Sequence, residues 1–190
     1  MKRSIISTDA SIIPRYATLP MVFASNRVYE WQSTGQGLIG LSFQERTLAH
    51  TFRKDYDAGD NGPLSWPQGF DLQNWGFLVI AQGDDLIAGA TIAHDTPGVQ
   101  MLNDDPHLAV LWDIRVQPHY QGQGLGRQLF TAAEDWSRAR GCHKLSVETQ
   151  NNNVAACQFY ANMGCEIESL RRFAYAEFPD EIQILWCKFL

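Results

Sequence analysis

The sequence predicts an α/β (α+β) fold in which helices pack against a mixed β-sheet. Between residues 75 and 116, short apolar runs rich in β-forming residues are separated by turn signals, as in antiparallel strands. After residue 121, apolar residues recur at helical spacing and then give way to a strand-like run, and this happens twice. An order of strand, helix, strand, helix, strand and strand after a hairpin implies a sheet of mixed direction.

Length and composition indicate one domain over residues 1–190. Of the 190 residues, 45% are hydrophobic and 19% are charged, and no repeat or linker interrupts them. Asp and Glu number 21 against 15 Lys and Arg, which gives a formal charge of −6. Because nucleic-acid binding requires a basic face, we expect no nucleic-acid partner. The acid excess is compatible with a cationic ligand.

The sequence also predicts a cytoplasmic protein. No apolar run approaches the roughly 20 residues of a membrane-spanning helix, and Asp9 and Pro14 interrupt the stretch that would serve as a signal peptide. The cysteines have no zinc-ligand spacing, so we expect reduced thiols and no metal. They are Cys142, Cys157, Cys165 and Cys187.

The first third of the chain predicts extended segments over residues 22–32 and 38–48, separated by turn-forming residues 33–37, and no helix. Residues 53–74 are rich in Gly, Pro and Asp and predict a long ordered loop. The aromatic residues of this region and just after it either line a pocket or cover the core. They are Trp66, Phe70 and Trp75.

From residue 75 the elements are clearer. Residues 75–81 and 86–93 predict a hairpin, and residues 108–116 predict a third strand that Pro118 ends. Alternation along this third strand separates Trp112, Ile114 and Val116 from Asp113 and Arg115 on the opposite face. The spacing predicts a helix from about residue 125 to Gly141 and a second helix ending at Gly164. Strands are predicted over residues 145–149, 165–170 and 182–189.

A glycine-rich turn joins the third strand to the first long helix. Gly122, Gly124 and Gly126 allow a tight turn, and the unpaired amides of a helix start together with Arg127 favour a phosphate. The alternative is a turn that binds no ligand. The spacing matches neither G-x-G-x-x-G nor G-x-x-x-x-G-K-[ST]; residues 121–126 instead read Q-x-x-G-x-G.

This turn resembles the pyrophosphate loop, [Q/R]-x-x-G-x-[G/A], of the GNAT superfamily of acetyl-CoA-dependent N-acetyltransferases. Residues 153–164 resemble the N-x-x-A-x-x-[FL]-Y-x-x-x-G-F helix of that superfamily, with Cys165 in place of the final Phe. The resemblance covers residues 75–190, whereas residues 1–74 are divergent. It implies a GNAT fold: a mostly antiparallel sheet of about six to seven strands, with helices on both faces, splayed at the acetyl-CoA site.

The resemblance also implies the residues that hold acetyl-CoA, the co-substrate. The backbone amides of the loop should hold the pyrophosphate, and strand backbone at Ile114 and Val116 should pair with the pantetheine arm. Asn153 should contact the arm, and Tyr160 should lie near the thioester sulfur. The loop residues are Gln121, Gly122, Gln123, Gly124, Leu125, Gly126 and Arg127.

Acetyl transfer by direct attack in a ternary complex requires a neutral amine, but an alkyl amine is neutral in only about one molecule in 10³ at pH 7. Asp113 and Glu148 are the candidate proton acceptors, and Tyr160 is the candidate acid for the leaving thiolate. The structural alternatives are an ion pair of Asp113 with Arg115, a solvated Glu148 and a core tyrosine. A covalent route through Cys157 or Cys165 is the competing mechanism.

Within the superfamily the chain resembles the streptothricin acetyltransferases, which acetylate an amine of the antibiotic's β-lysine moiety. The resemblance rests on residues 112–114, residues 148–156 and residues 180–186. It implies a small cationic amine as substrate, with Trp112, Asp113, Asp180 and Glu181 in the binding site. Acetylation of a protein N-terminus or lysine, and an acetyl-CoA sensor without turnover, remain alternatives, and a homodimer is left open.

Overall fold

The computed structural model of the chain describes residues 3–33, 35, 40–59 and 62–190. They form two compact units: the first holds Met1–Met21, Asp55–Val147 and Cys187–Leu190, and the second holds Val22–Lys54 and Glu148–Trp186. One sheet has the strand order β1-β4-β5-β6-β7-β9-β8, and β2 and β3 form a separate two-stranded sheet. Of the predicted turn and the start of the extended segment after it, residues 34 and 36–39 lie outside the described residues, as do residues 60 and 61 of the predicted loop.

The first unit contains the hairpin and third strand that the sequence predicts. Its strands are β1 (Ile5–Thr8), β4 (Gly76–Gln82), β5 (Asp85–His94), β6 (Leu108–Val116) and the start of β7 (Lys144–Gln150). The first four pair antiparallel in the order β1, β4, β5, β6. A parallel ladder joins Leu108–Val110 of β6 to Lys144–Ser146 of β7. The sheet is therefore mixed and mostly antiparallel, as predicted.

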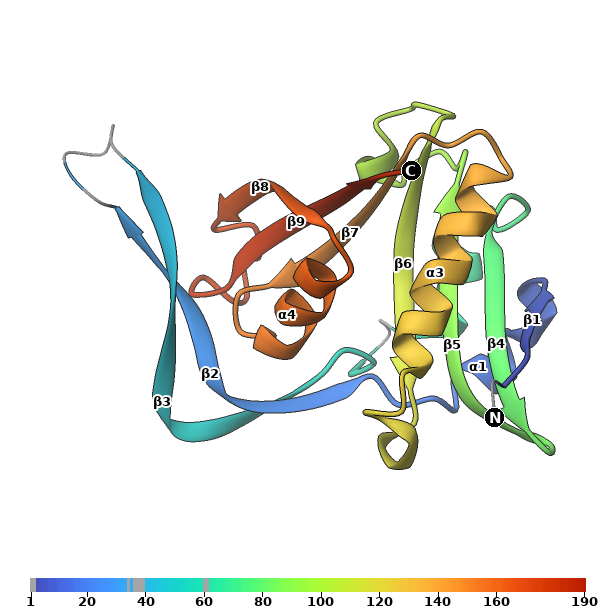
Figure 1. Cartoon of the computed structure of the whole chain (residues 1–190), viewed down its shortest axis with the longest axis horizontal. Helices are drawn as coiled ribbons and strands as arrows, with labels where there is room; N and C mark the ends of the chain where they lie inside the picture. The colour runs from blue at the N-terminus through green and yellow to red at the C-terminus, as the bar shows by residue number, and fades with distance from the viewer. Residues whose placement is uncertain (1–2, 34, 36–39, 60–61) are drawn as a thin grey trace. The chain divides into compact units, whose positions relative to one another are not determined.

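The long helix α3 (Leu125–Arg138) lies along β4, β5 and β6 (Figure 1). Its buried stripe follows the predicted helical spacing, beginning with Leu125 and Leu129. The sheet accommodates α3 through Gly76 of β4, since a Cβ there would lie 2.5 Å from the ring of Trp136.

The opposite face of the sheet packs on α1 (Ile13–Tyr16). A Cβ at Gly89 of β5 would lie 2.5 Å from the ring of Tyr16, so this glycine admits the ring. Val79 pairs with Gly89 across the sheet, and Val79 and Gly76 are three residues apart on β4. Val79 and Gly76 therefore point to opposite faces of β4. The face of Gly76 packs on α3 and the face of Gly89 packs on α1, which confirms the prediction of helices on both faces of the sheet.

The N-terminal third contains more regular structure than the sequence predicts. Helical turns η1 (Ala10–Ile12) and α1, together with strand β1, occupy a segment where no helix or strand was predicted. Two further turns, η2 (Pro63–Ser65) and α2 (Trp66–Gly69), lie within the predicted loop. Trp66 and Trp75 join the apolar core, at 6% and 5% exposure, and the partly buried Phe70 packs against it. Phe70 and Trp75 also line a cavity of about 600 Å³, so the core alternative holds for Trp66 and both alternatives hold for the other two rings.

A β-bulge interrupts the pairing of β5 with β6. Thr91 pairs with Asp113, and the next residue, Ile92, pairs with Leu111, so Trp112 is the extra residue. The regular alternation predicted along this strand is therefore broken at Trp112. The Trp112 ring contacts Phe70 and Trp75, with ring centroids 5.1 Å and 5.2 Å apart.

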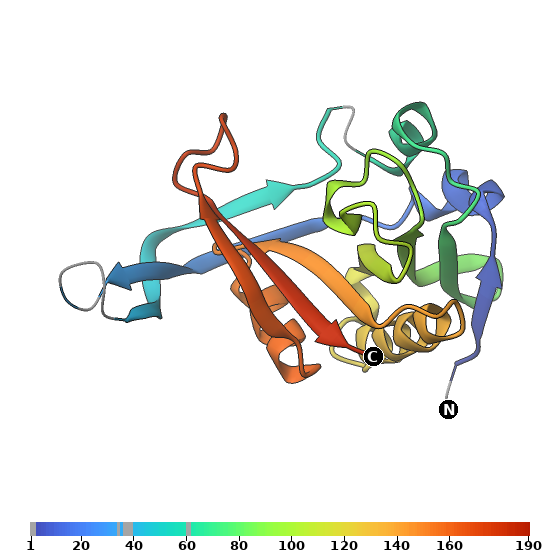
Figure 2. The same cartoon turned by 90° about the horizontal axis from the view of Figure 1, so that it is seen from above.

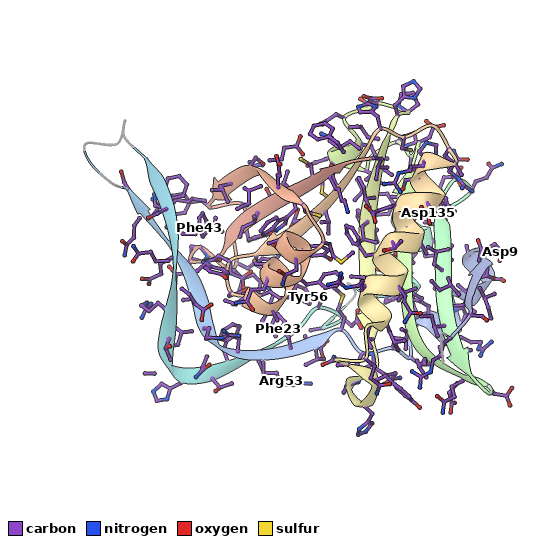
Figure 3. All side chains as sticks on the ribbon, in the orientation of Figure 1. Asp9, Phe23, Phe43, Arg53, Tyr56 and Asp135 are labelled. Carbon is purple, nitrogen blue, oxygen red and sulfur yellow. The ribbon has the colours of Figure 1, made fainter. Side chains whose placement is uncertain are left out.

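The second unit contains a long hairpin, a helix and a pair of strands. Its elements are β2 (Val22–Ser33), β3 (Leu41–Asp55), the end of β7, α4 (Val154–Asn162), β8 (Glu166–Arg172) and β9 (Ile182–Phe189). Strands β2 and β3 run side by side as a twisted ribbon (Figures 1 and 2). Edge-to-face contacts of Phe23 with Phe52 and of Tyr29 with Phe43 join the two strands; Phe23 and Phe43 are labelled in Figure 3. No helix among the described residues is long and apolar enough to cross a membrane.

A buried arginine ties together the segments of the first unit around β6. Arg115 donates to both oxygens of Asp113 and, at 2.6 Å and 2.8 Å, to both oxygens of Asp57. It also donates to the carbonyl of Leu19 at 2.9 Å, and the Tyr16 hydroxyl donates to Asp113 at 2.6 Å. Burial alone would lower the pKa of Arg115, but the hydrogen bond and charge of Asp113 raise it overall.

We expect Arg115→Met to lower the free energy of unfolding by about 3–5 kcal/mol, because it leaves the buried Asp113 carboxylate without its cation. Denaturant unfolding followed by circular dichroism measures the change. Arg138→Met is the matched control, since the Arg138 side chain is 46% exposed, its partner Asp135 is exposed, and its buried partner Glu134 keeps an ion pair with Lys188. Equal, small losses in both variants would show that the Arg115 network does not stabilise the fold.

Candidate active site

The predicted phosphate-binding turn lies between β6 and α3 in the first unit. The helical turn η4 (Pro118–Tyr120) is followed by Gly122 and Gly124, whose φ angles of 73° and 79° are in the left-handed region that favours glycine. Gly124 caps α3, and the helix's first backbone bond runs from the Gln128 amide to the Gly124 carbonyl at 3.1 Å. The amides of Leu125, Gly126 and Arg127 therefore have no carbonyl partner within the helix.

The space in front of this turn is open. A Cβ at Gly122 or Gly124 would meet no atom within 4 Å. Gln121 donates its side-chain amide to the Val116 carbonyl at 3.2 Å, and Gln123 donates to the His119 carbonyl at 3.1 Å, so both side chains hold the turn in shape. Free amides at a helix N-terminus, with the exposed Arg127 beside them, form a suitable anion site.

Strand β6 leads into this turn and presents Ile114 and Val116, both half-buried. One edge of each pairs with β5, opposite Ala90 and Ala88. The ladder to β7 involves the other end of β6, residues 108–110. The backbone of Ile114 and Val116 thus lies past that ladder, where the resemblance predicts pairing with the pantetheine arm.

Asp113 is 5% exposed, and both of its oxygens accept hydrogen bonds from Arg115. The ion pair that the sequence left open as the structural alternative therefore exists. The hydroxyl of Tyr16 also donates a hydrogen bond to Asp113 Oδ1. The adjacent Trp112 packs in the aromatic cluster described above. Proton transfer by Asp113 and substrate contact by Trp112 stay predictions.

Glu148 has a different environment, in the second unit. Its Oε1 accepts a hydrogen bond from the Tyr175 hydroxyl at 2.6 Å, and its Oε2 accepts one from Gln183 Nε2 at 2.6 Å. Gln150 Nε2 lies 3.4 Å from Glu148 Oε1 and donates to the Tyr175 oxygen at 2.8 Å. These donors are all neutral, and no ion pair to Glu148 occurs within the described residues. Burial raises the pKa of Tyr175, so this phenol stays protonated.

The two faces of β7 carry different groups. Thr149 lies on the face of α4, since its hydroxyl is 3.6 Å from Cys157 Sγ of that helix and accepts a hydrogen bond from Trp186. The neighbouring side chain of Glu148 therefore points to the opposite face. Tyr160, one helical turn after Cys157, is buried on the inner side of α4 at 5% exposure. The face of β7 that carries Thr149 therefore contacts α4, through Cys157.

Asn153 begins α4. Its side-chain oxygen accepts a hydrogen bond from the Ala156 amide at 3.1 Å, which is a standard helix N-cap. Asn153 therefore has a structural role as the N-cap of α4, and its contact with a cofactor arm stays a prediction.

Asp180 and Glu181 line a cavity of about 790 Å³ within the second unit. Glu181 forms an ion pair with Lys54 and accepts a hydrogen bond from Asn152 at 2.8 Å, whereas Asp180 is exposed. Hairpin residues, including Glu30, Trp31 and Phe52, complete the lining. The cavity therefore combines carboxylates with aromatic rings.

All four cysteines are buried and none forms a disulfide within the described residues. Burial raises the pKa of the Cys157 thiol, which disfavours the thiolate that a covalent route through Cys157 would need. Among the described residues, no group of three or more His, Cys, Asp or Glu side chains could hold a metal.

Sequence reasoning missed the partners that distinguish the two carboxylates. Asp57 and Tyr16 reach Asp113 and Arg115 from distant segments, and Tyr175 and Gln183 reach Glu148 in the same way. Among the partners of Glu148, only Gln150 could be expected near it from the sequence, because residues i and i+2 of a strand share a face.

A known protein family matches more than half of this chain. The family model described as "Acetyltransferase (GNAT) family" matches residues 45–165. A streptothricin acetyltransferase from Escherichia coli is 31% identical over 77% of this chain and 75% of its own length. One from Streptomyces lavendulae is 27% identical over 77% of this chain and 74% of its own length. Streptothricin acetyltransferase A of Bacillus subtilis is 35% identical, but the match spans only 46% of that protein.

Two solved structures are similar over the full chain. Nourseothricin acetyltransferase covers 100% of this chain and 99% of its own, with a TM-score of 0.75 and 19% identity. A protein of Bacillus anthracis in complex with acetyl coenzyme A covers 100% and 98%, with a TM-score of 0.76 and 19% identity. At this identity the two structures establish the shared fold.

Gly124→Val should weaken acetyl-CoA binding by about tenfold or more, because a β-branched side chain disfavours the left-handed backbone that presents the helix amides. Isothermal calorimetry measures the affinity. Gly83→Val is the control, since Gly83 has a φ of 62° and open space but lies in the β4–β5 turn. An unchanged dissociation constant in a folded Gly124→Val variant would remove the turn from the binding site.

Proposed function

The chain belongs to the acetyltransferase (GNAT) family and is therefore an acetyl-CoA-dependent N-acetyltransferase; we propose that its acceptor is a primary amine of a small cationic molecule, with streptothricin as the first candidate. The observation that carries this proposal is the similarity to two streptothricin acetyltransferases over about three quarters of their length. The cavity lined by Asp180 and Glu181 also contains Arg46 and Arg172. Its support for a cationic ligand comes from the exposed Asp180, since Glu30 and Glu181 are paired with Arg46 and Lys54.

The turn before α3 fits the phosphates of the co-substrate. Its left-handed glycines, open front and free amides suit the pyrophosphate, and Arg127 adds a cation. Residues Gln121 to Arg127 would hold the pyrophosphate, and the β6 backbone at Ile114 and Val116 would pair with the pantetheine arm. Acetyl-CoA supplies the activated thioester.

Glu148 is the proton acceptor in this proposal. Asp113 and Glu148 are both carboxylates on strands, but the charge of Asp113 is compensated by Arg115, whereas the donors to Glu148 are neutral. A carboxylate that keeps its net charge both attracts an ammonium group and removes its proton. Glu148 thus accepts the proton that the nitrogen loses as the new C–N bond forms.

Tyr160 is the proton donor to the thiolate that leaves when the C–S bond breaks. This role for Tyr160 comes from the resemblance of residues 153–164 to the family's helix, and the burial of its phenol suits a position beside a bound thioester. In this proposal Asp113 stabilises the fold through its ion pair with Arg115, and Trp112 stabilises it through the aromatic cluster.

We expect Glu148→Gln to lower kcat/KM by about 10²-fold and to flatten its rise with pH, because the amide accepts no proton. Steady-state thiol release over a range of pH measures both effects. Glu166→Gln, on the exposed face of β8, is the matched control. Wild-type profiles in both variants would exclude Glu148 as the base.

A panel of acceptors tests the substrate. We expect thiol release from acetyl-CoA to be fastest with streptothricin, slower with polyamines and aminoglycosides, and slowest with peptides, because a free chain end or lysine lacks the multiple charges of the small cations. Mass spectrometry of the product locates the acetyl group. Fast acetylation of peptides alone would favour a protein acetyltransferase, and tight acetyl-CoA binding without release to any amine would indicate a sensor.

A further inference from the structure

We infer that Tyr175 is a positioning residue that orients the Glu148 carboxylate; this inference rests on the proposed role of Glu148. Tyr175 lies in the segment between β8 and β9, far from Glu148 in the sequence. Its hydroxyl oxygen lies 2.6 Å from Glu148 Oε1. Neither residue pattern nor spacing indicates this contact.

The direction of the hydrogen bonds is fixed by chemistry. Gln150 Nε2 lies near both the Tyr175 oxygen and Glu148 Oε1, and an ionised carboxylate only accepts, so the nitrogen of this amide faces the pair. Because the amide donates to the phenol oxygen, the single phenol proton points to Glu148. Tyr175 is therefore a dedicated donor to that carboxylate.

Each oxygen of Glu148 has its own strong donor. Tyr175 binds Oε1, and Gln183 Nε2 binds Oε2 at 2.6 Å. With both oxygens held, the plane of the carboxylate is fixed, and the remaining lone pairs stay available for an ammonium group. A base held in one orientation contributes more to a proton transfer than one that rotates.

Burial raises the pKa of Tyr175, so the phenol keeps the proton that it donates to Glu148. Glu181 is the other carboxylate that acts on Tyr175, and it is paired with Lys54. The Tyr175 hydroxyl is therefore a donor to Glu148, and removing it frees one oxygen of that carboxylate.

The decisive measurement does not depend on activity. Carbon-detected NMR at a fixed neutral pH gives the chemical shift of the Glu148 carboxyl carbon in the wild type and in Tyr175→Phe, with Glu148→Gln used to assign the signal. We expect Tyr175→Phe to move this signal, because Oε1 loses its phenol donor. Tyr29→Phe, in the same unit, is the matched control and should leave the signal in place.

Kinetics provide the second measurement. In Tyr175→Phe, kcat should fall by about tenfold while the KM for acetyl-CoA stays unchanged, because only the orientation of the base is lost. In the Glu148→Gln background, Tyr175→Phe should have no further effect, because its target is already absent. An independent, additive loss in the double variant would mean that Tyr175 acts elsewhere and would overturn the inference.

The outcomes separate this inference from the proposed function. An unmoved Glu148 carboxyl signal in folded Tyr175→Phe overturns the positioning role, even where Glu148→Gln abolishes acetylation. A moved signal combined with full activity of Glu148→Gln supports the positioning contact and overturns the role of Glu148 as base.

Discussion

The arrangement of the first unit depends on the burial of Arg115 between two carboxylates. One guanidinium cannot be buried alone, and Asp113 and Asp57 supply the compensating charge from β6 and from the segment after β3. The Leu19 carbonyl and the Tyr16 hydroxyl satisfy the remaining hydrogen-bonding groups. This network therefore fixes α1, the segment after it and the segment after β3 against the strand that leads into the glycine turn.

The two candidate carboxylates are the same chemical group in different environments. Asp113 is enclosed by a cation and a buried phenol, which makes it part of the fold. Glu148 is held by a phenol and two amides, which orient it without cancelling its charge. The proposed role of Glu148 as base depends on this uncompensated charge and fixed orientation.

The sequence predicted the elements whose signal is local. Strands over residues 108–116 and 182–189 have the predicted bounds, and α3 and α4 follow from helical spacing and a terminal glycine. The bulge at Trp112 could not be predicted, because an extra residue in a ladder depends on the partner strand. The contacts of Asp113 with Tyr16 and of Glu148 with Tyr175 join distant segments, so no period or spacing in the sequence reports them.

The first unit is assembled from three separate stretches of chain, and this has a consequence for folding. Lys188 forms an ion pair with Glu134 of α3, and the Leu190 amide donates to the His143 carbonyl, so residues 187–190 complete a unit that begins near residue 3. Contacts of such high sequence separation slow folding, since a long loop must close before they form. During synthesis the first unit therefore reaches its final packing only after the second unit has been translated.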